Sequence, residues 1–257
     1  MKPVSDHIKE ALRVIEYGKE KGIPIRVLGA TAIRVHCPKY AELHKSLGRE
    51  LTDIDFAAYI KHSKEIVNLF EELGYTQKRY LSVMMGDALK FRRFFFDEGN
   101  NRLVDVFLDK LSMCHEINFK ERLEVDYPTL PLAELFLTKM QIVKLTIKDV
   151  KDLIVLLMEH EIGDNDNDTI NINHIAKLLS EDWGFYYTVT LNIDKIKKYM
   201  DESTFNVMSA SYKDHVKQKL DKMLKVIEEY PKTLKWRMRA RIGTKKIWYQ
   251  EVEEVIR

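Results

Sequence analysis

Two aspartates separated by one residue, Asp53 and Asp55, are the side chains of this chain best suited to carry chemistry. They lie in the segment 51–56, where polar and apolar residues alternate as in a β-strand. Because successive strand side chains point to opposite faces, we expect both carboxylates on one face and Ile54 and Phe56 in a core. Mg²⁺ prefers such oxygen ligands together with substrate phosphates, and it would relieve the repulsion between the two acids. The alternative is a pair of solvated acids on an exposed strand.

A third carboxylate, Asp105, interrupts the otherwise apolar run 103–107. A lone buried carboxylate is unfavourable, so Asp105 is expected either to complete a metal site or to form a salt bridge within the sheet. Three carboxylates can hold two Mg²⁺ ions about 4 Å apart and align a hydroxyl with a triphosphate. In this hypothesis Asp53 and Asp55 bind the ions, and Asp105 completes the site and helps to deprotonate the attacking hydroxyl.

Small residues precede the acids in the chain. Gly29, Ala30 and Thr31 follow a short apolar segment, 24–28, and begin a predicted helix. Small residues let backbone N–H groups approach a phosphate closely, and a helix N-terminus favours negative charge. Thr31 adds a hydroxyl donor. These residues therefore predict a phosphate-binding turn beside the acids.

The elements that must position these residues change in character near residue 130. Before it, we predict helices over 5–21, 30–46 (continuous or broken at Pro38) and 62–73, strands over 24–28 and 52–59, and a hairpin of 91–96 and 103–108. After it, an apolar stripe over 132–157 predicts one long helix or two, a polar loop covers 163–173, and a further helix covers 213–230. We therefore expect an α+β fold. A mixed twisted sheet with flanking helices occupies residues 1–130, and a helical C-terminal domain with a basic tail occupies 131–257.

Composition excludes several classes of protein. The 257 residues include 42 Lys+Arg and 40 Asp+Glu, with 45% hydrophobic residues, which is typical of a folded domain. No apolar run is long enough for a membrane span, and the N-terminus lacks the apolar stretch of a secretory signal. Two cysteines are expected to be thiols in a reducing cytoplasm. From Lys213 onward there are 13 Lys+Arg and 7 Asp+Glu, which predicts a solvated helical face or a nucleic-acid contact.

The order of these motifs resembles the nucleotidyltransferase superfamily with the DNA polymerase β-like minimal fold. Its signature is a hydrophobic strand, Gly-Gly or Gly-Ser, a helix, then Asp-x-Asp and a third Asp on a later strand. Gly29-Ala30-Thr31-Ala32-Ile33 is similar to the Gly-Gly-Thr-Ala-Leu version, although Ala30 replaces the second small residue of the signature. Arg49 with Thr52-Asp53-Ile54-Asp55-Phe56 is similar to the Arg…Ser/Thr…Asp-Ile-Asp-Phe version. Both variants are typical of the branch that contains the AbiEii-type bacterial toxins.

A second segment resembles the helical motif of that branch, in which a Lys-Leu stretch precedes Arg/Lys-Asp-x-x-Asp. Here the matching residues lie in 137–145 and 148–153. The resemblance implies that Lys139 meets the triphosphate and that Asp149 and Asp152 orient basic groups or the acceptor. The alternative is that Lys148 and Asp152, which are i,i+4 neighbours, simply pair on a helix surface.

The resemblance implies a nucleotidyltransferase that uses Mg²⁺ or Mn²⁺ to move a nucleoside monophosphate from an NTP to a hydroxyl of RNA, a protein or a small molecule. Asp53, Asp55 and Asp105 would be its catalytic and metal-binding residues. The nucleotide-binding residues it implies are Gly29, Ala30, Thr31, Arg49, Thr52, Lys139, Asp149 and Asp152. A toxin-like role would add an antitoxin protein as a partner. The alternative is a catalytically silent nucleotide- or partner-binding protein of the same fold.

Overall fold

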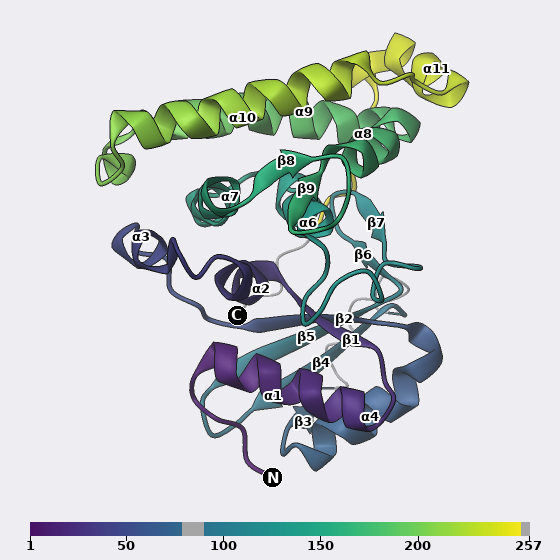
Figure 1. Cartoon of the computed structure of the whole chain (residues 1–257). Helices are drawn as coiled ribbons and strands as arrows, with labels where there is room; N and C mark the ends of the chain where they lie inside the picture. The colour runs from purple at the N-terminus through teal and green to yellow at the C-terminus, as the bar shows by residue number, and fades with distance from the viewer. Residues whose placement is uncertain (79–89, 253–257) are drawn as a thin grey trace. The chain divides into compact units, whose positions relative to one another are not determined.

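The computed structural model of the protein describes residues 1–78 and 90–252, which form two compact units. The first unit contains Met1–Pro38, Glu50–Ser112 and Glu116–Pro131 within these described residues. The second contains Lys39–Arg49, Met113–His115 and the chain from Leu132 onward, of which 253–257 lie outside the described residues. Figure 1 follows the chain through its elements.

A mixed sheet forms the centre of the first unit. Its strands are β1 (Ile25–Leu28), β2 (Ile54–Ala58), β3 (Thr76–Gln77), β4 (Arg92–Asp97) and β5 (Arg102–Leu108). They are ordered β1-β2-β5-β4-β3, with β2 and β5 parallel and the other neighbours antiparallel. The predicted hairpin is therefore confirmed as β4 and β5. The predicted strand over 52–59 is shorter than expected, so Asp53 immediately precedes β2.

Helices α1 (His7–Glu20) and α4 (Ser63–Glu72) cover one face of this sheet (Figure 1). The ring of Phe70 in α4 packs on Phe56 of β2 and Phe95 of β4, with centroids 5.7 and 4.3 Å apart. In α1, Gly18 approaches the sheet so closely that an added Cβ would lie 2.6 Å from Ile25 Cγ2. Because these paired strand residues share one face, the apolar core of the unit lies on that side.

The other described elements of the first unit extend its edges. Helix α2 (Gly29–His36) follows β1 directly, and the short helix η1 (Ile60–His62) leads into α4. Strands β6 (Lys110–Ser112) and β7 (Glu116–Asn118) follow the first hairpin and pair antiparallel. Val27 exchanges backbone hydrogen bonds with the segment 128–130, which covers the outer edge of β1.

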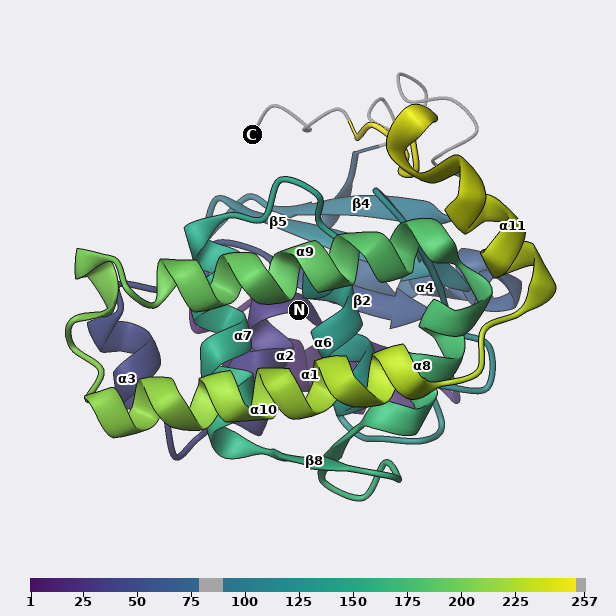
Figure 2. The same cartoon turned by 90° about the horizontal axis from the view of Figure 1, so that it is seen from above.

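The described part of the second unit is mainly helical. Its helices are α3 (Ala41–Ser46), α6 (Leu132–Met140), α7 (Ile147–Glu159), α8 (Ile172–Glu181), α9 (Trp183–Tyr199), η3 (Ser203–Phe205), α10 (Ala210–Glu229), α11 (Leu234–Ile242) and η4 (Gly243–Lys245). Figure 2 shows α9 and α10 as long helices that run beside each other over α6 and α7. The apolar stripe over 132–157 is divided into two helices, because Thr146 and Asp149 form a capping box that starts α7. The α+β class predicted from the sequence is confirmed.

Two local predictions are resolved by these elements. The predicted helix over 30–46 is interrupted, as α2 ends before Pro38 and α3 begins after it. The segment 163–173 is not a plain loop, since β9 (Thr169–Asn171) pairs with β8 (Glu161–Gly163). Burial of Ile162 and Ile170 accounts for this pairing, because apolar residues between polar neighbours favour strands with one covered face. No helix among the described residues is long and apolar enough to cross a membrane.

Candidate active site

Two of the three candidate acids lie side by side on the sheet. Asp55 of β2 and Asp105 of β5 are register partners on parallel strands, so their side chains leave the same face. Leu28 and Phe94 are the partners on the outer sides, which completes a row across four strands. Asp105 is 6% exposed, whereas Asp55 is partly exposed. The predicted alternation is confirmed for Asp55, because Ile54 and Phe56 on either side of it are fully buried on the opposite face, whereas Asp53 lies outside the strand.

Asp53 lies just ahead of β2, where hydroxyl groups hold its segment. The Thr31 hydroxyl donates to the Asp53 backbone carbonyl at 3.3 Å, and the Thr52 hydroxyl donates to the Asp53 Oδ1 at the same distance. Thr31 is itself buried. In this structure the Thr31 hydroxyl therefore supports the acidic segment, a contact that the sequence analysis did not foresee.

Gly29 places the start of α2 against the second acid. Its φ of +71° lies in the left-handed region, and an added Cβ would lie 2.5 Å from Asp55 Oδ2. Only glycine meets both requirements, because other residues disfavour that backbone conformation and would displace the carboxylate. Ala30 and Thr31, both buried, continue the first turn of α2. The N-terminus of α2, which favours negative charge, is thus in direct contact with Asp55.

Arg92 of β4 forms an ion pair with Asp105, and this residue was not singled out from the sequence. Its Nε lies 3.3 Å from Asp105 Oδ1, and its Nη2 contacts Oδ2. The guanidinium carbon is 4.9 Å from the ring centre of Phe94 and 4.5 Å from that of Phe107. Of the two alternatives for Asp105, the salt bridge is therefore present. The register of the hairpin indicates this ion pair, because Arg92 pairs with Phe107 and is therefore a diagonal neighbour of Asp105.

The three acids are not gathered around one point. Within the described residues of the first unit, no three His, Cys, Asp or Glu side chains have ligand atoms that all lie within 4.8 Å of one another. The ligand atoms of Asp53, Asp55 and Asp105 therefore do not all lie within reach of one ion in this arrangement. The donor set itself is suitable, since carboxylate oxygens are the ligands that Mg²⁺ prefers.

His7 of α1 is another neighbour of the acidic segment that the sequence analysis did not find. Burial lowers the pKa of His7 below its usual value of 6.5, and Arg102 acts in the same direction. A hydrogen bond to the Thr52 backbone and the charge of Asp53 oppose this shift only in part. The imidazole is therefore neutral near pH 7, which leaves it as a hydrogen-bonding group instead of a counter-charge for Asp53.

The candidate residues of the helical motif form a separate cluster within the second unit. Asp152 of α7 is fully buried, and its carboxylate contacts three basic side chains. The contacting atoms are His44 Nε2 at 2.8 Å, Arg49 Nε at 2.9 Å and Lys139 Nζ at 2.9 Å. The cluster therefore ties α3 and Arg49, three residues beyond its end, to α6 and α7 through one carboxylate.

Charges in this cluster compensate one another. Burial alone would raise the pKa of Asp152, but Lys139, His44 and Arg49 hold it well below the usual range. Burial would likewise lower the pKa of Lys139, but Asp152 and Asp149 outweigh it and raise that pKa. The expectation that Asp152 pairs with Lys148 on a helix surface is wrong, because Asp152 faces the interior and Lys148 is exposed.

Asp149 has two structural contacts. It accepts from Lys139 Nζ at 3.1 Å, and it completes the capping box with Thr146 at the start of α7.

The candidate residues are divided between the two units. The first unit holds Gly29, Thr31, Thr52 and the three aspartates. The second holds Lys139, Asp149, Asp152 and also Arg49, although only a few residues separate Arg49 from Thr52 in the chain.

Comparisons with known proteins find little similarity to this chain. No family model matches it, and no curated protein matches it. One solved structure with which it aligns is the solution structure of the antibiotic-resistance factor ANT(2'')-Ia. That alignment covers 67% of this chain and 93% of the other, with 11% identity and a TM-score of 0.41. A likeness at this level is too distant to assign a fold or an activity.

Proposed function

We propose that the protein is a Mg²⁺-dependent nucleotidyltransferase that moves a nucleoside monophosphate from an NTP to a hydroxyl acceptor. The observation that carries this proposal is the register pairing of Asp55 with Asp105 on parallel strands, with the glycine turn before α2 in contact with Asp55. Two carboxylates beside a helix N-terminus combine a site for a divalent cation with a site for phosphate. The acceptor class remains RNA, a protein or a small molecule.

Asp53, Asp55 and Asp105 are the residues proposed to hold Mg²⁺ or Mn²⁺. A bound ion of this kind neutralises charge on a triphosphate and helps to align the reacting oxygens. The protein's own contribution is positioning: the sheet fixes Asp55 and Asp105, and Thr31 and Thr52 hold the backbone and side chain of Asp53. Binding of the ion by Asp105, or acceptance of a proton from the acceptor, would compete with its ion pair with Arg92.

The remaining nucleotide-binding assignments are also proposals. For Gly29 and Ala30 they draw support from the position of both residues in the first turn of α2. For Arg49, Lys139, Asp149 and Asp152 they rest on the sequence resemblance. The mutual bonds among these four residues, described above, favour a structural role for them in the second unit. We therefore expect their removal to affect stability before nucleotide affinity.

A second function is favoured by one specific observation. Arg92 supplies a counter-charge to Asp105 from within the sheet, a contact that would also serve a protein without catalysis. The alternative proposal is therefore a catalytically silent nucleotide- or partner-binding protein. A toxin-like role with an antitoxin partner belongs to the first proposal and rests on the resemblance of the Gly-Ala-Thr and Asp-Ile-Asp motifs.

Binding and transfer measurements separate the two proposals. Mn²⁺ titration followed by electron paramagnetic resonance, with and without a non-hydrolysable NTP, measures the metal site directly. Transfer is measured with α-³²P-labelled NTPs against RNA, cell lysate and small hydroxyl compounds. The enzyme proposal predicts that Asp55→Asn and Asp105→Asn each weaken Mn²⁺ binding and abolish labelling. Nucleotide or partner binding without labelling, unchanged in both variants, would favour the silent protein.

Glu98→Gln supplies the matched control for this experiment. Glu98 is an exposed carboxylate in the turn of the same β4–β5 hairpin, where it pairs with Lys78. Its removal changes the net charge by the same amount but leaves the row of β2 and β5 intact. Mn²⁺ affinity and labelling in this variant are expected to equal those of the wild type.

A further inference from the structure

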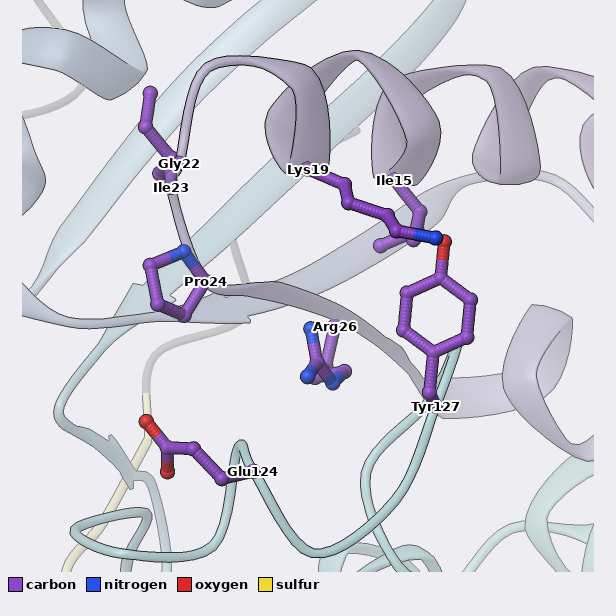
Figure 3. A pocket seen from close by; sticks show the side chains of 8 residues that line it. All are labelled: Ile15, Lys19, Gly22, Ile23, Pro24, Arg26, Glu124 and Tyr127. Atoms are coloured by element: carbon purple, nitrogen blue, oxygen red, sulfur yellow. The ribbon is translucent and has the colours of Figure 1, made fainter.

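A surface pocket of the first unit combines two cations with one aromatic ring (Figure 3). Its volume is about 370 Å³, within the range of small-molecule sites. Ile15 and Ile23 contribute apolar surface, and Lys19, Arg26, Glu124 and Tyr127 contribute polar groups. All of these residues belong to the first unit, and none of them is a proposed catalytic or nucleotide-binding residue.

The two cations converge on Tyr127. Lys19 Nζ lies 5.3 Å from the centre of the tyrosine ring, and Arg26 Cζ lies 5.2 Å from it. Such contacts stabilise a cation only modestly at exposed sites. Within the described part of the chain, neither cation has a carboxylate within 4.0 Å. Glu124 and Asp126 act on Arg26 from a longer distance, and the Tyr127 hydroxyl donates a hydrogen bond to Glu16, so carboxylates surround the pocket without forming a direct ion pair with either cation.

Arg26 is positioned with donors to spare. Its Nε donates to the Asp126 backbone carbonyl at 2.6 Å, and its Nη1 donates to the Ile25 carbonyl at 2.8 Å. A guanidinium carries five N–H groups, so three remain for another acceptor. Burial lowers the pKa of Arg26 from its usual value, which indicates that this charge is poorly solvated. An anion in the pocket would accept hydrogen bonds from the remaining N–H groups of Arg26 and would also stabilise its poorly solvated charge.

Glu124 limits the charge of the occupant. Its carboxylate lines the pocket and accepts a hydrogen bond from the Tyr59 hydroxyl at 2.6 Å. In Figure 3 it lies apart from Lys19 and Tyr127, on the far side of Arg26. The lining therefore holds two cations and one carboxylate, and Glu16 at the Tyr127 hydroxyl and Asp126 near Arg26 lie just outside it. The isoleucine surface next to the cations matches an apolar body.

We propose that this pocket binds small organic acids. The carboxylate of the ligand contacts Lys19 and Arg26 beside the Tyr127 ring, and its apolar part lies against Ile15 and Ile23. The charge-assisted hydrogen bonds give selectivity for the anion, and burial of the apolar part adds affinity in proportion to its area. This binding requires neither a metal nor a nucleotide, so it stands independently of the proposed transferase activity.

A matched pair of probes tests the proposal. 3-Phenylpropionate carries the carboxylate, and 3-phenylpropionamide has the same shape without the charge. Titration of each into the ¹⁵N-labelled full-length protein, followed by amide chemical shifts, measures affinity and locates the site. We expect the acid to shift amides around Lys19, Arg26 and Tyr127 and to bind at least tenfold more tightly than the amide. Equal binding of both probes, or shifts confined to another region, would overturn the proposal.

Variants separate the pocket from general charge effects. Lys19→Met and Arg26→Gln are each expected to weaken 3-phenylpropionate binding about tenfold, in line with the loss of one charge-assisted contact. Lys19 is exposed, so its replacement does not endanger the fold. Lys21→Met is the control, because Lys21 lies on the same helix end but pairs with Glu72 outside the pocket. Unchanged affinity in Lys19→Met, or an equal loss in Lys21→Met, would contradict the assignment.

Discussion

Arg92 and Asp105 form an ion pair diagonally across the β4–β5 hairpin, and Asp55 is the neighbour of Asp105 on the other side. The guanidinium thus balances the more buried of two adjacent carboxylates. Rings of Phe94 and Phe107 pack against it and limit its movement. Removal of Arg92 therefore tests whether Asp55 and Asp105 require a positive counter-charge.

Replacement of Arg92 should make the protein depend on divalent cations. We expect Arg92→Met to lower the free energy of unfolding by about 3 kcal/mol without metal, because it removes the guanidinium from an ion pair with a buried carboxylate. Millimolar Mg²⁺ should then stabilise the variant more than the wild type, since binding to the folded state alone raises stability. Urea unfolding followed by circular dichroism at increasing Mg²⁺ measures both effects. An identical Mg²⁺ response in the two proteins would argue against a metal site at Asp105.

The control for this prediction is Lys110→Met. Lys110 of β6 pairs with Glu116 of β7 in the same unit, and Glu116 is well exposed. Exposed pairs of this kind contribute about 0–1 kcal/mol. We expect a small loss of stability in this variant and no change in its response to Mg²⁺.

Two glycines with nearly the same φ test the contact with Asp55. Gly22 and Gly29 have φ of +69° and +71°, but an added Cβ meets nothing within 4 Å at Gly22 and lies 2.5 Å from Asp55 Oδ2 at Gly29. Gly22→Ala should cost about 1 kcal/mol, from the left-handed backbone alone. Gly29→Ala should cost about 3 kcal/mol, because it also displaces the carboxylate. Amide hydrogen exchange of β2 and β5 measures the difference, and equal effects would contradict it.

The buried cluster around Asp152 should dominate the stability of the second unit. Asp152→Asn leaves Arg49, Lys139 and His44 without their common acceptor, and breaking such a buried pair costs about 3–5 kcal/mol. Lys148→Gln, at the exposed i,i+4 position, should change stability by less than about 0.5 kcal/mol. All three tryptophans lie in this unit, so their fluorescence reports its unfolding. A comparable loss in both variants would show that the cluster is not the main determinant.

His115 should make the second unit less stable in mild acid. Burial lowers the pKa of His115 from 6.5 to about 4, where it stacks on Phe185 and bonds to Thr188 at 2.8 Å. As the pH falls from 6.5 to about 4, the unfolded chain gains a proton that the folded chain does not. The free energy of unfolding therefore decreases over this window, by up to about 3 kcal/mol, and His115 contributes no further change below it.

Tryptophan fluorescence during urea unfolding at several pH values measures this dependence. His115→Gln should remove most of the change in that window, although it also lowers stability at neutral pH through the lost stacking. His62→Gln, at a partly exposed position of the first unit, should retain it. A wild-type protein whose second unit is equally stable at the two ends of the window would refute the prediction.

Much of the fold follows from local patterns in the sequence. The alternation of Ile54 and Phe56 with aspartates predicts a strand with one buried face, and both apolar residues are fully buried. The hairpin, the break near Pro38 and the helices follow from turn residues and apolar spacing, which act over a few residues. The strands at Glu161–Gly163 and Thr169–Asn171 were missed, because strands this short leave almost no periodic signal.

The sequence by itself determined the types of side chain available to the site: a glycine turn, an Asp-x-Asp segment and an isolated acid in an apolar strand. Only the tertiary structure decided their partners. In the folded chain, Asp55 lies beside Asp105, and Asp105 forms an ion pair with Arg92. Arg49, Lys139 and His44 all contact the carboxylate of Asp152. The reason is that a strand or helix pattern specifies which face a residue occupies. Strand order, register and helix packing, which depend on contacts distant in the chain, specify what that face meets.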